Sequence, residues 1–433
     1  MNSSITSSDA VSENGGVTGF VWQFVAMSAA ILFAVAAFNW TVDPFGIFQE
    51  WPVEGFNRAK PVILTHARMI KALEVRRLKP AGLAMGTSRT GLGIDLEHPG
   101  WPEGSEPRYS LTLADCNTYE MFRYLQHAAA VGPVRTVLIG LDFYTFNATF
   151  SNRQDFSETR LAVAADGSWN KPDPDEFLST LFSFDALKCS WETIAANRRP
   201  PLPGGRQRLG LRAMFLLTED EYITDRWFPP PRGEFAFEDS AAGRATVAEF
   251  ERLLRFARTK DIRLYLFISP CHARLLECLG RKGLWPAYEE WERRLVAAVE
   301  VDAARHPNER PVELWDFSGY NSVTTERVPR YGDRSAEMTN YMDSTHYTRV
   351  VGDWVQDRVF GRNTPGLLAH PDFGVRLNAA NIERHLADLT KARAAYRIQQ
   401  SEDAAEVAAL AAMKKGDAMS RRIEDLQLRS RGE

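Results

Sequence analysis

The chain has 433 residues, which is long enough for one large domain with insertions or for two to three small domains. Hydrophobic residues make up 44% and charged residues 25%, a composition typical of globular proteins that excludes disorder along the whole length. The net charge of −4 provides no overall positive field for nucleic acid, and none of the four cysteines forms a C-x-x-C pair. We therefore expect no nucleic-acid partner, no zinc ribbon and no disulfide framework.

An uncharged segment near the N-terminus predicts a membrane anchor. Residues 19–40 contain no Asp, Glu, Lys or Arg, and as a helix they would span a hydrocarbon core of about 30 Å. We interpret residues 1–18 as a disordered N-terminus and residues 19–40 as an uncleaved transmembrane helix. The alternative is a cleaved signal peptide, because Ala34 and Ala36 fit a small-x-small cleavage site, although the preceding residues include acidic and no basic side chains.

The charges alone leave the orientation of this anchor open. The first basic residues after the span are Arg58 and Lys60, which by the positive-inside rule would keep the following domain in the cytoplasm. Long domains, however, cross membranes largely regardless of their charge. The side of the membrane on which the body lies therefore has to be inferred from its chemistry.

Beyond the anchor, apolar runs suited to buried strands alternate with segments of helical spacing. The strand runs are residues 81–86, 135–142, 262–269 and 312–316, and the helical segments are residues 64–77, 119–130, 247–259, 288–304 and 348–360. This alternation predicts an α/β fold with a parallel sheet that is covered by helices on both faces.

Two stretches depart from this alternation. Residues 147–236 form a long insertion with a basic Pro/Gly-rich segment at 198–208, which we interpret as loops and a helical subdomain over one end of the sheet. A solvated linker is the alternative. Residues 363–433 form a C-terminal tail that, from Asn378 onward, is polar, rich in Ala and typical of helix. We expect this helical tail to pack on the body or on a partner.

Polar residues follow the strands at their carboxyl ends, where ligands of an open parallel sheet bind, and a further group precedes the last amphipathic helix. They are Gly86-Thr87-Ser88-Arg89, Asp142, Ser269-Pro270-Cys271-His272, Asp316 and Asp343-Ser344-Thr345-His346. A serine hydroxyl becomes nucleophilic when a neutral imidazole accepts its proton and a carboxylate orients that imidazole. Ser88, His346 and Asp343 fit these three roles. Alone, Ser88 would be a turn or helix-cap residue; its joint placement with Asp-x-x-His favours catalysis.

These two motifs resemble the first and last blocks of the SGNH/GDSL hydrolase superfamily. Its first block places a serine in a Gly-Asp-Ser-like turn after the first strand, as in Gly86-Thr87-Ser88-Arg89, and its last block is Asp-x-x-His, as in Asp343 and His346. The resemblance extends over residues 80–360 and implies a flavodoxin-like, three-layer SGNH domain, which we assign to residues 41–362. It also implies that the serine is the nucleophile, the histidine the general base and the aspartate its orienting partner.

Four further features resemble the membrane-anchored branch of this superfamily that modifies cell-surface polymers, including proteins that acetylate alginate and D-alanylate teichoic acids. They are the single anchor, Asp43-Pro44-Phe45-Gly46, Gly140-Leu141-Asp142-Phe143 and Ser269-Pro270-Cys271-His272. The resemblance implies an O-acyltransferase or esterase that acts on a bacterial surface polysaccharide from a periplasmic or other extracytoplasmic domain. Its partners would be the polysaccharide, the membrane and a membrane protein that transfers acyl groups, and no metal or organic cofactor is needed.

Two motifs depart from the pattern of the superfamily. The third block normally supplies an asparagine to the oxyanion hole, but Asp142 stands at that position and could donate a hydrogen bond only if it were protonated. Otherwise Arg89, Asn117 or backbone N–H groups would have to stabilise the oxyanion. The second block lacks its glycine, because Leu113-Ala114-Asp115 occupies that place.

These departures leave three alternatives open. His272 either orients a substrate near Ser88 or caps the helix that begins at Ala273. The chain is either an enzyme or a non-catalytic polysaccharide-binding or assembly subunit with a degenerate site. A cytoplasm-facing anchored esterase is the third alternative, which the basic residues after the span permit.

Overall fold

The computed structural model describes residues 10–48, 51–171, 174–198, 215–216, 218–219, 223, 233–329 and 338–412. Its backbone divides into two compact units. The first comprises residues 1–70 and 171–202, and the second comprises residues 71–170 and 203–433. The insertion predicted at residues 147–236 is thus shared between the two units.

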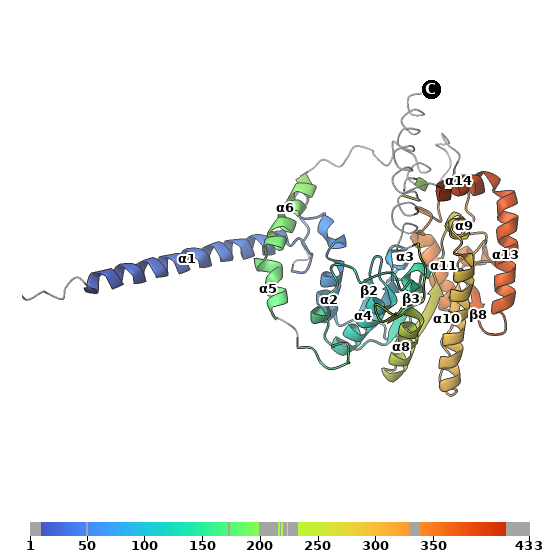
Figure 1. Ribbon diagram of the computed structural model, residues 1–433, viewed down its shortest axis with the longest axis horizontal. Coiled ribbons are helices and arrows are strands. Elements are labelled where there is room, and N and C mark those ends of the chain that lie inside the picture. Colours follow the sequence, from blue (N-terminus) through green and yellow to red (C-terminus); the bar gives the residue numbers. More distant parts are fainter. Residues whose placement is uncertain are drawn as a thin grey trace, which may run out of the picture. The chain divides into compact units, whose positions relative to one another are not determined.

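The first unit contains the predicted anchor as one long helix, α1 (Ala10–Val42), which is the extended N-terminal helix of Figure 1. Its segment Val17–Val42 is long and apolar enough to cross a membrane, and its most apolar stretch is not buried by the protein. A helix over the predicted residues 19–40 is therefore confirmed. Residues 10–18, which were expected to be disordered, instead form the first turns of α1.

Two helices of the insertion, α5 (Pro174–Phe182) and α6 (Phe184–Arg198), pack against α1 in the same unit, which also contains the 3-10 helix η1 (Pro61–Leu64). The predicted helical subdomain is therefore present. It packs on the anchor helix. Its expected place over one end of the sheet stays a prediction. The rest of the basic segment, residues 199–208, lies outside the described residues.

The second unit is built around a six-stranded sheet with the strand order β2-β1-β3-β6-β7-β8. Its strands are β1 (Gly82–Gly86), β2 (Arg108–Thr112), β3 (Thr136–Leu141), β6 (Arg263–Ile268), β7 (Leu314–Asp316) and β8 (Val375–Leu377). Neighbours from β2 to β7 pair in parallel, and β8 pairs antiparallel with β7. The four predicted strand runs correspond to β1, β3, β6 and β7, which confirms a mixed α/β protein with a mostly parallel sheet.

Successive side chains of the central strands face two separate cores, as the alternation of a strand requires. Val137 and Ile139 on β3 belong to one cluster of buried apolar residues, and Leu138 between them belongs to the other. The first core is covered by α2 (Ala67–Leu78), α4 (Thr118–Val131), α8 (Thr246–Thr259), α9 (Ala273–Arg281) and α10 (Trp285–Arg305). Helix α11 (Arg349–Val359) covers the second core. The sheet is therefore covered on both faces.

Shorter elements connect these layers. They are α3 (Ser88–Gly93), η2 (Phe143–Phe146), η3 (Glu158–Arg160), α12 (Pro365–Leu368) and the two-stranded sheet of β4 (Glu238–Asp239) and β5 (Arg244–Ala245). Helix α3 follows β1 directly and η2 follows β3, so both begin at the carboxyl edge of the sheet.

The C-terminal tail forms two helices, α13 (Ile382–Gln399) and α14 (Ser401–Ala412), after the unpredicted edge strand β8. Both helices pack on the body. Arg274 on α9 pairs with Asp403 on α14 at 2.9 Å, and Arg393 on α13 pairs with Glu277 on α9 at 3.0 Å. The helical tail is therefore confirmed as far as residue 412, and residues 413–433 lie outside the described residues.

Candidate active site

Ser88 follows a turn at the end of β1 that favours glycine. Gly86, the last residue of β1, has a φ of +142°, and a Cβ atom there would lie 2.8 Å from the carbonyl oxygen of Gly140 on β3. Thr87 then caps α3, because its Oγ1 accepts the backbone N–H of Arg89 at 3.3 Å. Ser88 is therefore the first residue of α3 and lies at the carboxyl edge of the sheet.

Ser88 meets His346, which lies 258 positions later in the chain. The distance between Ser88 Oγ and His346 Nε2 is 2.9 Å, and the distance between His346 Nδ1 and Asp343 Oδ2 is 2.7 Å. An ionised carboxylate can only accept hydrogen bonds, so Nδ1 carries the proton toward Asp343. Nε2 of a neutral His346 is then left to accept the hydroxyl proton of Ser88.

Asp343 is buried and surrounded by hydrogen-bond donors. Its Oδ1 accepts from the backbone N–H of Thr345 at 2.8 Å, from the hydroxyl of Thr345 at 2.7 Å and from the backbone N–H of His346 at 2.9 Å. Burial opposes the ionised carboxyl, but the bonds from His346 and Thr345 outweigh it and lower the pKa of Asp343 below its ordinary value. The Asp-x-x-His spacing therefore folds into a loop that holds both the carboxylate and the imidazole.

A cavity of about 30 Å³ lies beside Ser88. It is lined by Thr87, Ser88, Arg89, Asp115, Cys116, Asp142, Tyr144, Thr145, Phe150, Thr345 and His346. The structure thus brings four predicted site residues to one small space, with Asp343 behind His346. The aromatic lining residues Tyr144 and Phe150 were missed in the sequence analysis, although Tyr144 lies only three residues after the end of β3 and could have been found by that position.

Asp142 binds Arg89 within this cavity wall. Arg89 Nη1 donates to Asp142 Oδ1 at 3.1 Å, and the hydroxyl of Thr87 donates to Asp142 Oδ2 at 2.5 Å. Burial opposes the guanidinium charge, yet Asp142 and other nearby groups keep the pKa of Arg89 above its ordinary value. Both oxygens of Asp142 act as acceptors here, so this arrangement offers no proton from Asp142 to an oxyanion.

Two predicted site residues lie outside the cavity and have structural roles. Asn117 caps α4, because its Oδ1 accepts the N–H of Glu120 at 2.9 Å, and its Nδ2 donates to the carbonyl of Phe150 at 3.1 Å. His272 is fully buried and caps α9, as one of its two interpretations predicted. Its Nδ1 accepts the N–H of Arg274, and its Nε2 bonds the carbonyl of Glu326 at 2.6 Å.

The second-block position contains a residue with an unusual backbone conformation. Asp115, in the stretch Leu113-Ala114-Asp115 where the resemblance implied a glycine, has a φ of +51° and lines the cavity beside Ser88. This left-handed conformation is the one that glycine adopts without cost. The backbone N–H of Asp115 makes no hydrogen bond with another residue of the described ranges. The loop after β2 therefore keeps a glycine-like backbone without glycine.

Two groups among the described residues have ligand atoms close enough to hold a metal ion. One is Glu292, Asp316 and His385, and the other is His66, Asp185 and Cys189; within each group the ligand atoms lie within 4.8 Å of one another. Neither group includes Ser88, His346 or another residue of the cavity. In the first group His385 Nε2 lies 2.8 Å from Asp316 Oδ2, which is the distance of an ordinary ion pair.

A larger cavity of about 750 Å³ lies at the opposite edge of the sheet. Thr136 and Arg263, the first residues of β3 and β6, line it, whereas Ser88 follows the last residue of β1. No triad residue lines this larger cavity. The larger of these two cavities is therefore not the one at which the hydrogen-bonded polar side chains meet.

No family model, no curated protein and no solved structure matches this chain. The structure therefore defines its class by fold and geometry: a mixed α/β protein with a mostly parallel sheet, one apolar N-terminal helix and a Ser-His-Asp chain of hydrogen bonds at the carboxyl edge of the sheet.

Proposed function

We propose that this chain is a membrane-anchored, SGNH-type O-acyltransferase or esterase that modifies a bacterial surface polysaccharide through an acyl-serine intermediate. The observation that carries the proposal is the continuous set of hydrogen bonds from Ser88 through His346 to Asp343. Three residues that are separated by up to 258 positions meet in the order and at the atoms that nucleophilic acyl transfer requires.

In the first half of the reaction, Ser88 Oγ forms a bond to the carbonyl carbon of the acyl donor. Its proton passes to His346 Nε2, and Asp343 stabilises the imidazolium that results. The bond between the acyl carbon and the leaving oxygen then breaks, and the leaving oxygen takes the proton from His346. In the second half, His346 removes a proton from a sugar hydroxyl or from water, whose oxygen attacks the acyl carbon. The bond between that carbon and Ser88 Oγ then breaks, and Oγ takes the proton back from His346.

The oxyanion of each tetrahedral intermediate needs hydrogen-bond donors near Ser88. The guanidinium of Arg89 lines the cavity and is held by Asp142. As the first residue of α3, Ser88 has no intrahelical partner for its own N–H. We infer that these groups, together with the N–H of Asp115, replace the missing asparagine of the third block and the missing glycine of the second block.

The sheet order supports an SGNH-type, flavodoxin-like domain within residues 41–362. The five parallel strands follow the order 2-1-3-4-5 when they are numbered along the chain, which is the flavodoxin-like order. Ser88 follows the first of these strands, and the Asp-x-x-His loop precedes α11. These are the positions at which the superfamily has its nucleophile and its acid–base pair.

The proposed substrate and location follow from the membrane-anchored branch that the sequence resembles. Helix α1 supports an anchor, and an extracytoplasmic body is proposed because surface polysaccharides lie on that side. The cavity of about 30 Å³ has room for a small acyl group beside Ser88. A membrane acyl-transfer protein would supply that group, and the polysaccharide would receive it.

A non-catalytic polysaccharide-binding or assembly subunit is the second candidate function. The observation that favours it is Asp142, because a carboxylate at the oxyanion position that only accepts hydrogen bonds would oppose catalysis. The two candidates differ in whether Ser88 becomes acylated.

The test is hydrolysis of p-nitrophenyl acetate by the full-length chain in detergent, measured beside Ser88→Ala. Ser240→Ala is the matched control, because Ser240 is exposed in the turn between β4 and β5. We expect turnover in the unsubstituted chain and in Ser240→Ala, and none in Ser88→Ala. Mass spectrometry after incubation with a fluorophosphonate should find the adduct on Ser88. Equal turnover in all three proteins, or no turnover and no adduct in a folded chain, contradicts the enzymatic proposal.

A further inference from the structure

Two tryptophans lie toward the two ends of the apolar segment Val17–Val42 of α1. Trp22 is 69% exposed and Trp40 is 49% exposed. They are separated by about 27 Å along the helix, which is close to the thickness of a hydrocarbon core, about 30 Å. Tryptophan gathers at both boundaries of a membrane, where its ring meets the headgroups. A membrane crossed by α1 would therefore have one of its headgroup layers at the level of Trp40.

The helices α5 and α6 attach to α1 at this same level. Asn39, next to Trp40, is fully buried. Its Nδ2 donates to the carbonyl of Leu181 at 2.7 Å, and its Oδ1 accepts from the hydroxyl of Ser190 at 2.8 Å. The carbonyl of Leu181 lies in the last turn of α5, where no intrahelical donor is available, so Asn39 supplies the missing bond.

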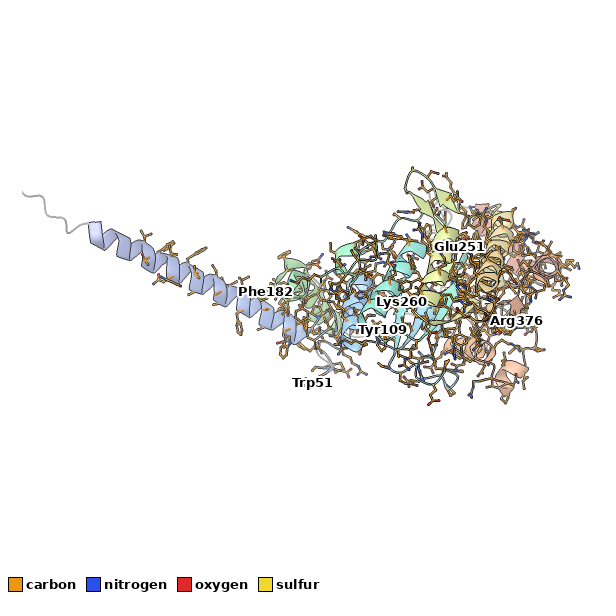
Figure 2. All side chains as sticks on the ribbon, turned by 90° about the horizontal axis from the view of Figure 1, so that it is seen from below. Trp51, Tyr109, Phe182, Glu251, Lys260 and Arg376 are labelled. Atoms are coloured by element: carbon orange, nitrogen blue, oxygen red, sulfur yellow. The ribbon has the colours of Figure 1, made fainter. Side chains whose placement is uncertain are left out.

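Aromatic contacts strengthen this attachment. The rings of Phe38 on α1 and Trp191 on α6 lie 6.1 Å apart, and those of Phe48, shortly after α1, and Phe177 on α5 lie 5.3 Å apart. The pair α5 and α6, which we call the hairpin, is therefore held beside the C-terminal end of α1, and Figure 2 shows Phe182 of α5 at that end.

The hairpin leaves large apolar side chains uncovered. They are Phe177 at 45% exposure, Leu178 at 45%, Phe182 at 42%, Phe184 at 82% and Trp191 at 69%. On the surface of a soluble protein, exposed apolar side chains usually occur singly. A group of large exposed apolar side chains therefore indicates a contact with a membrane or with another protein.

We propose that the hairpin lies in the headgroup layer of the membrane that α1 crosses, with these five side chains in contact with lipid. The hairpin is continuous with the end of the apolar helix, so the same lipid that surrounds α1 would reach it. Lys188 is exposed and lies between Phe184 and Trp191 on one face of α6, where its ammonium pairs with Glu192 at 3.8 Å. Such a pair fits the polar side of this layer. The proposal rests on α1 crossing a membrane and not on the acyl-transfer chemistry.

The test places one labelled cysteine at a time in the full-length chain, reconstituted in liposomes of phosphatidylethanolamine and phosphatidylglycerol. The labelled positions are Phe184→Cys and Trp191→Cys in the hairpin, with Phe33→Cys in the middle of α1 as the lipid reference. Ile398→Cys on α13 is the water reference, because Ile398 is 80% exposed and so matches Phe184. The four native cysteines are buried, and the unsubstituted chain gives their background labelling.

The measurement is the accessibility of a nitroxide label to oxygen, which concentrates in lipid, relative to a water-soluble nickel complex. We expect the ratio at positions 184 and 191 to be clearly higher than at 398 and lower than at 33, because the headgroup layer lies between water and the middle of the hydrocarbon core. Ratios at 184 and 191 equal to that at 398, while 33 reports lipid, overturn the proposal for the hairpin alone. Labels at 184 and 191 that are shielded from both reagents also overturn it, because a protein would then cover the hairpin.

A second measurement avoids bulky labels. Tryptophan emission is recorded in liposomes with lipids brominated near the headgroup, for the unsubstituted chain, for Trp191→Phe and for Trp169→Phe. Trp169 is 61% exposed and belongs to the other unit, so it is the matched control. We expect Trp191→Phe to reduce the quenched part of the emission, whereas Trp169→Phe leaves it unchanged. An unchanged quenched part in Trp191→Phe contradicts contact with lipid.

Discussion

Arg89 and Asp142 form a buried ion pair one residue away from Ser88, with 3.1 Å between Arg89 Nη1 and Asp142 Oδ1. The side chains of both residues are less than 10% exposed. The pair joins the first turn of α3 to the end of β3, so it ties the helix that starts with Ser88 to the sheet. Asp142 is therefore best explained as the residue that positions Arg89.

We expect Asp142→Asn to lower the free energy of unfolding by about 3 kcal/mol, because it leaves the buried Arg89 without a compensating charge. The same substitution should also lower turnover, because Arg89 would no longer be held in the cavity wall. Urea unfolding and ester hydrolysis measure the two effects. Glu313→Gln is the control: it breaks the pair with the exposed Arg376, labelled in Figure 2, and should cost less than about 1 kcal/mol. Raised turnover in Asp142→Asn would instead favour a protonated Asp142 as the oxyanion donor.

Asp343→Asn should lower kcat by about 10⁴ while leaving the fold intact, because the amide no longer holds the tautomer of His346 that accepts from Ser88. Thr345→Val tests the supporting bond to Asp343 Oδ1 and should have a smaller effect. Single-turnover acylation of Ser88 measures both. A kcat for Asp343→Asn within a few-fold of the unsubstituted value would exclude the triad.

The lowered pKa of Asp343 also predicts a pH dependence of stability. A carboxyl whose folded pKa lies below the ordinary value of 3.8 stabilises the fold above that pH and loses this contribution as the pH falls through its folded pKa. The difference in the free energy of unfolding between the unsubstituted chain and Asp343→Asn should therefore be constant from pH 5 to 7 and shrink on acidification below about 4. Chemical unfolding at a series of pH values measures it, and a difference that grows on acidification would contradict the prediction.

We expect His385 on α13 to contribute to the stability of the fold in a pH-dependent way. Burial disfavours its imidazolium, but the hydrogen bonds and charges of Asp316 and Glu292 outweigh burial and raise the pKa of His385 to about 10. Burial and Asp316 raise the pKa of Glu292 to about 7. Both shifts favour the protonated forms, so this contribution to stability declines as the pH rises from about 5 to 10.

We therefore expect His385→Gln to destabilise the chain by about 3 kcal/mol at pH 6 and by much less at pH 10. Thermal unfolding at the two pH values measures the difference. His306→Gln is the control, since His306 is also a helix-terminal histidine near an aspartate, Asp302, but is more exposed. Equal destabilisation by His385→Gln at both pH values would show that its packing, and not its charge, holds α13.

His272 should matter for stability and not for the chemical step. His272→Ala leaves the N–H of Arg274 and the carbonyl of Glu326 without their partner, which should cost about 1–3 kcal/mol. His272→Asn, which can still cap α9, should recover part of that loss. Turnover per folded molecule is the measurement that separates the roles: it should stay within two-fold of the unsubstituted chain in both variants, and a selective loss of kcat would place His272 in the reaction.

The strands that were predicted from the sequence are those whose side chains are mostly buried. β1 and β3 are buried along their whole length, so they appear in the sequence as unbroken apolar runs. β2 was missed because it alternates between buried and half-buried side chains at the edge of the sheet, and β8 was missed because two of its three side chains are exposed. β2 and β8 form by pairing with β1 and β7, and the local sequence pattern does not indicate such pairing.

Ser88, Asp343 and His346 were predicted from three kinds of information. These were the chemistry of their side chains, their positions relative to the predicted strands, and the resemblance to a known superfamily. Local sequence could not tell that Asn117 and His272 cap helices, because capping and substrate binding use the same side chains at the same positions after a loop. It also could not place α5 and α6 on α1, since the bonds to Asn39 join residues about 150 positions apart.

The order of apolar and polar residues by itself determined the anchor helix, the alternation of strands and helices and the serine at the end of the first strand, because each depends on neighbours within a few residues. Tertiary structure decided which polar groups meet. Asp142 pairs with Arg89, His346 reaches Ser88 and His385 reaches Asp316 only after the parallel sheet brings its carboxyl ends to one edge. A charge or a hydrogen-bonding group has a chemical role only once its partner is placed, and that placement is a property of the folded chain.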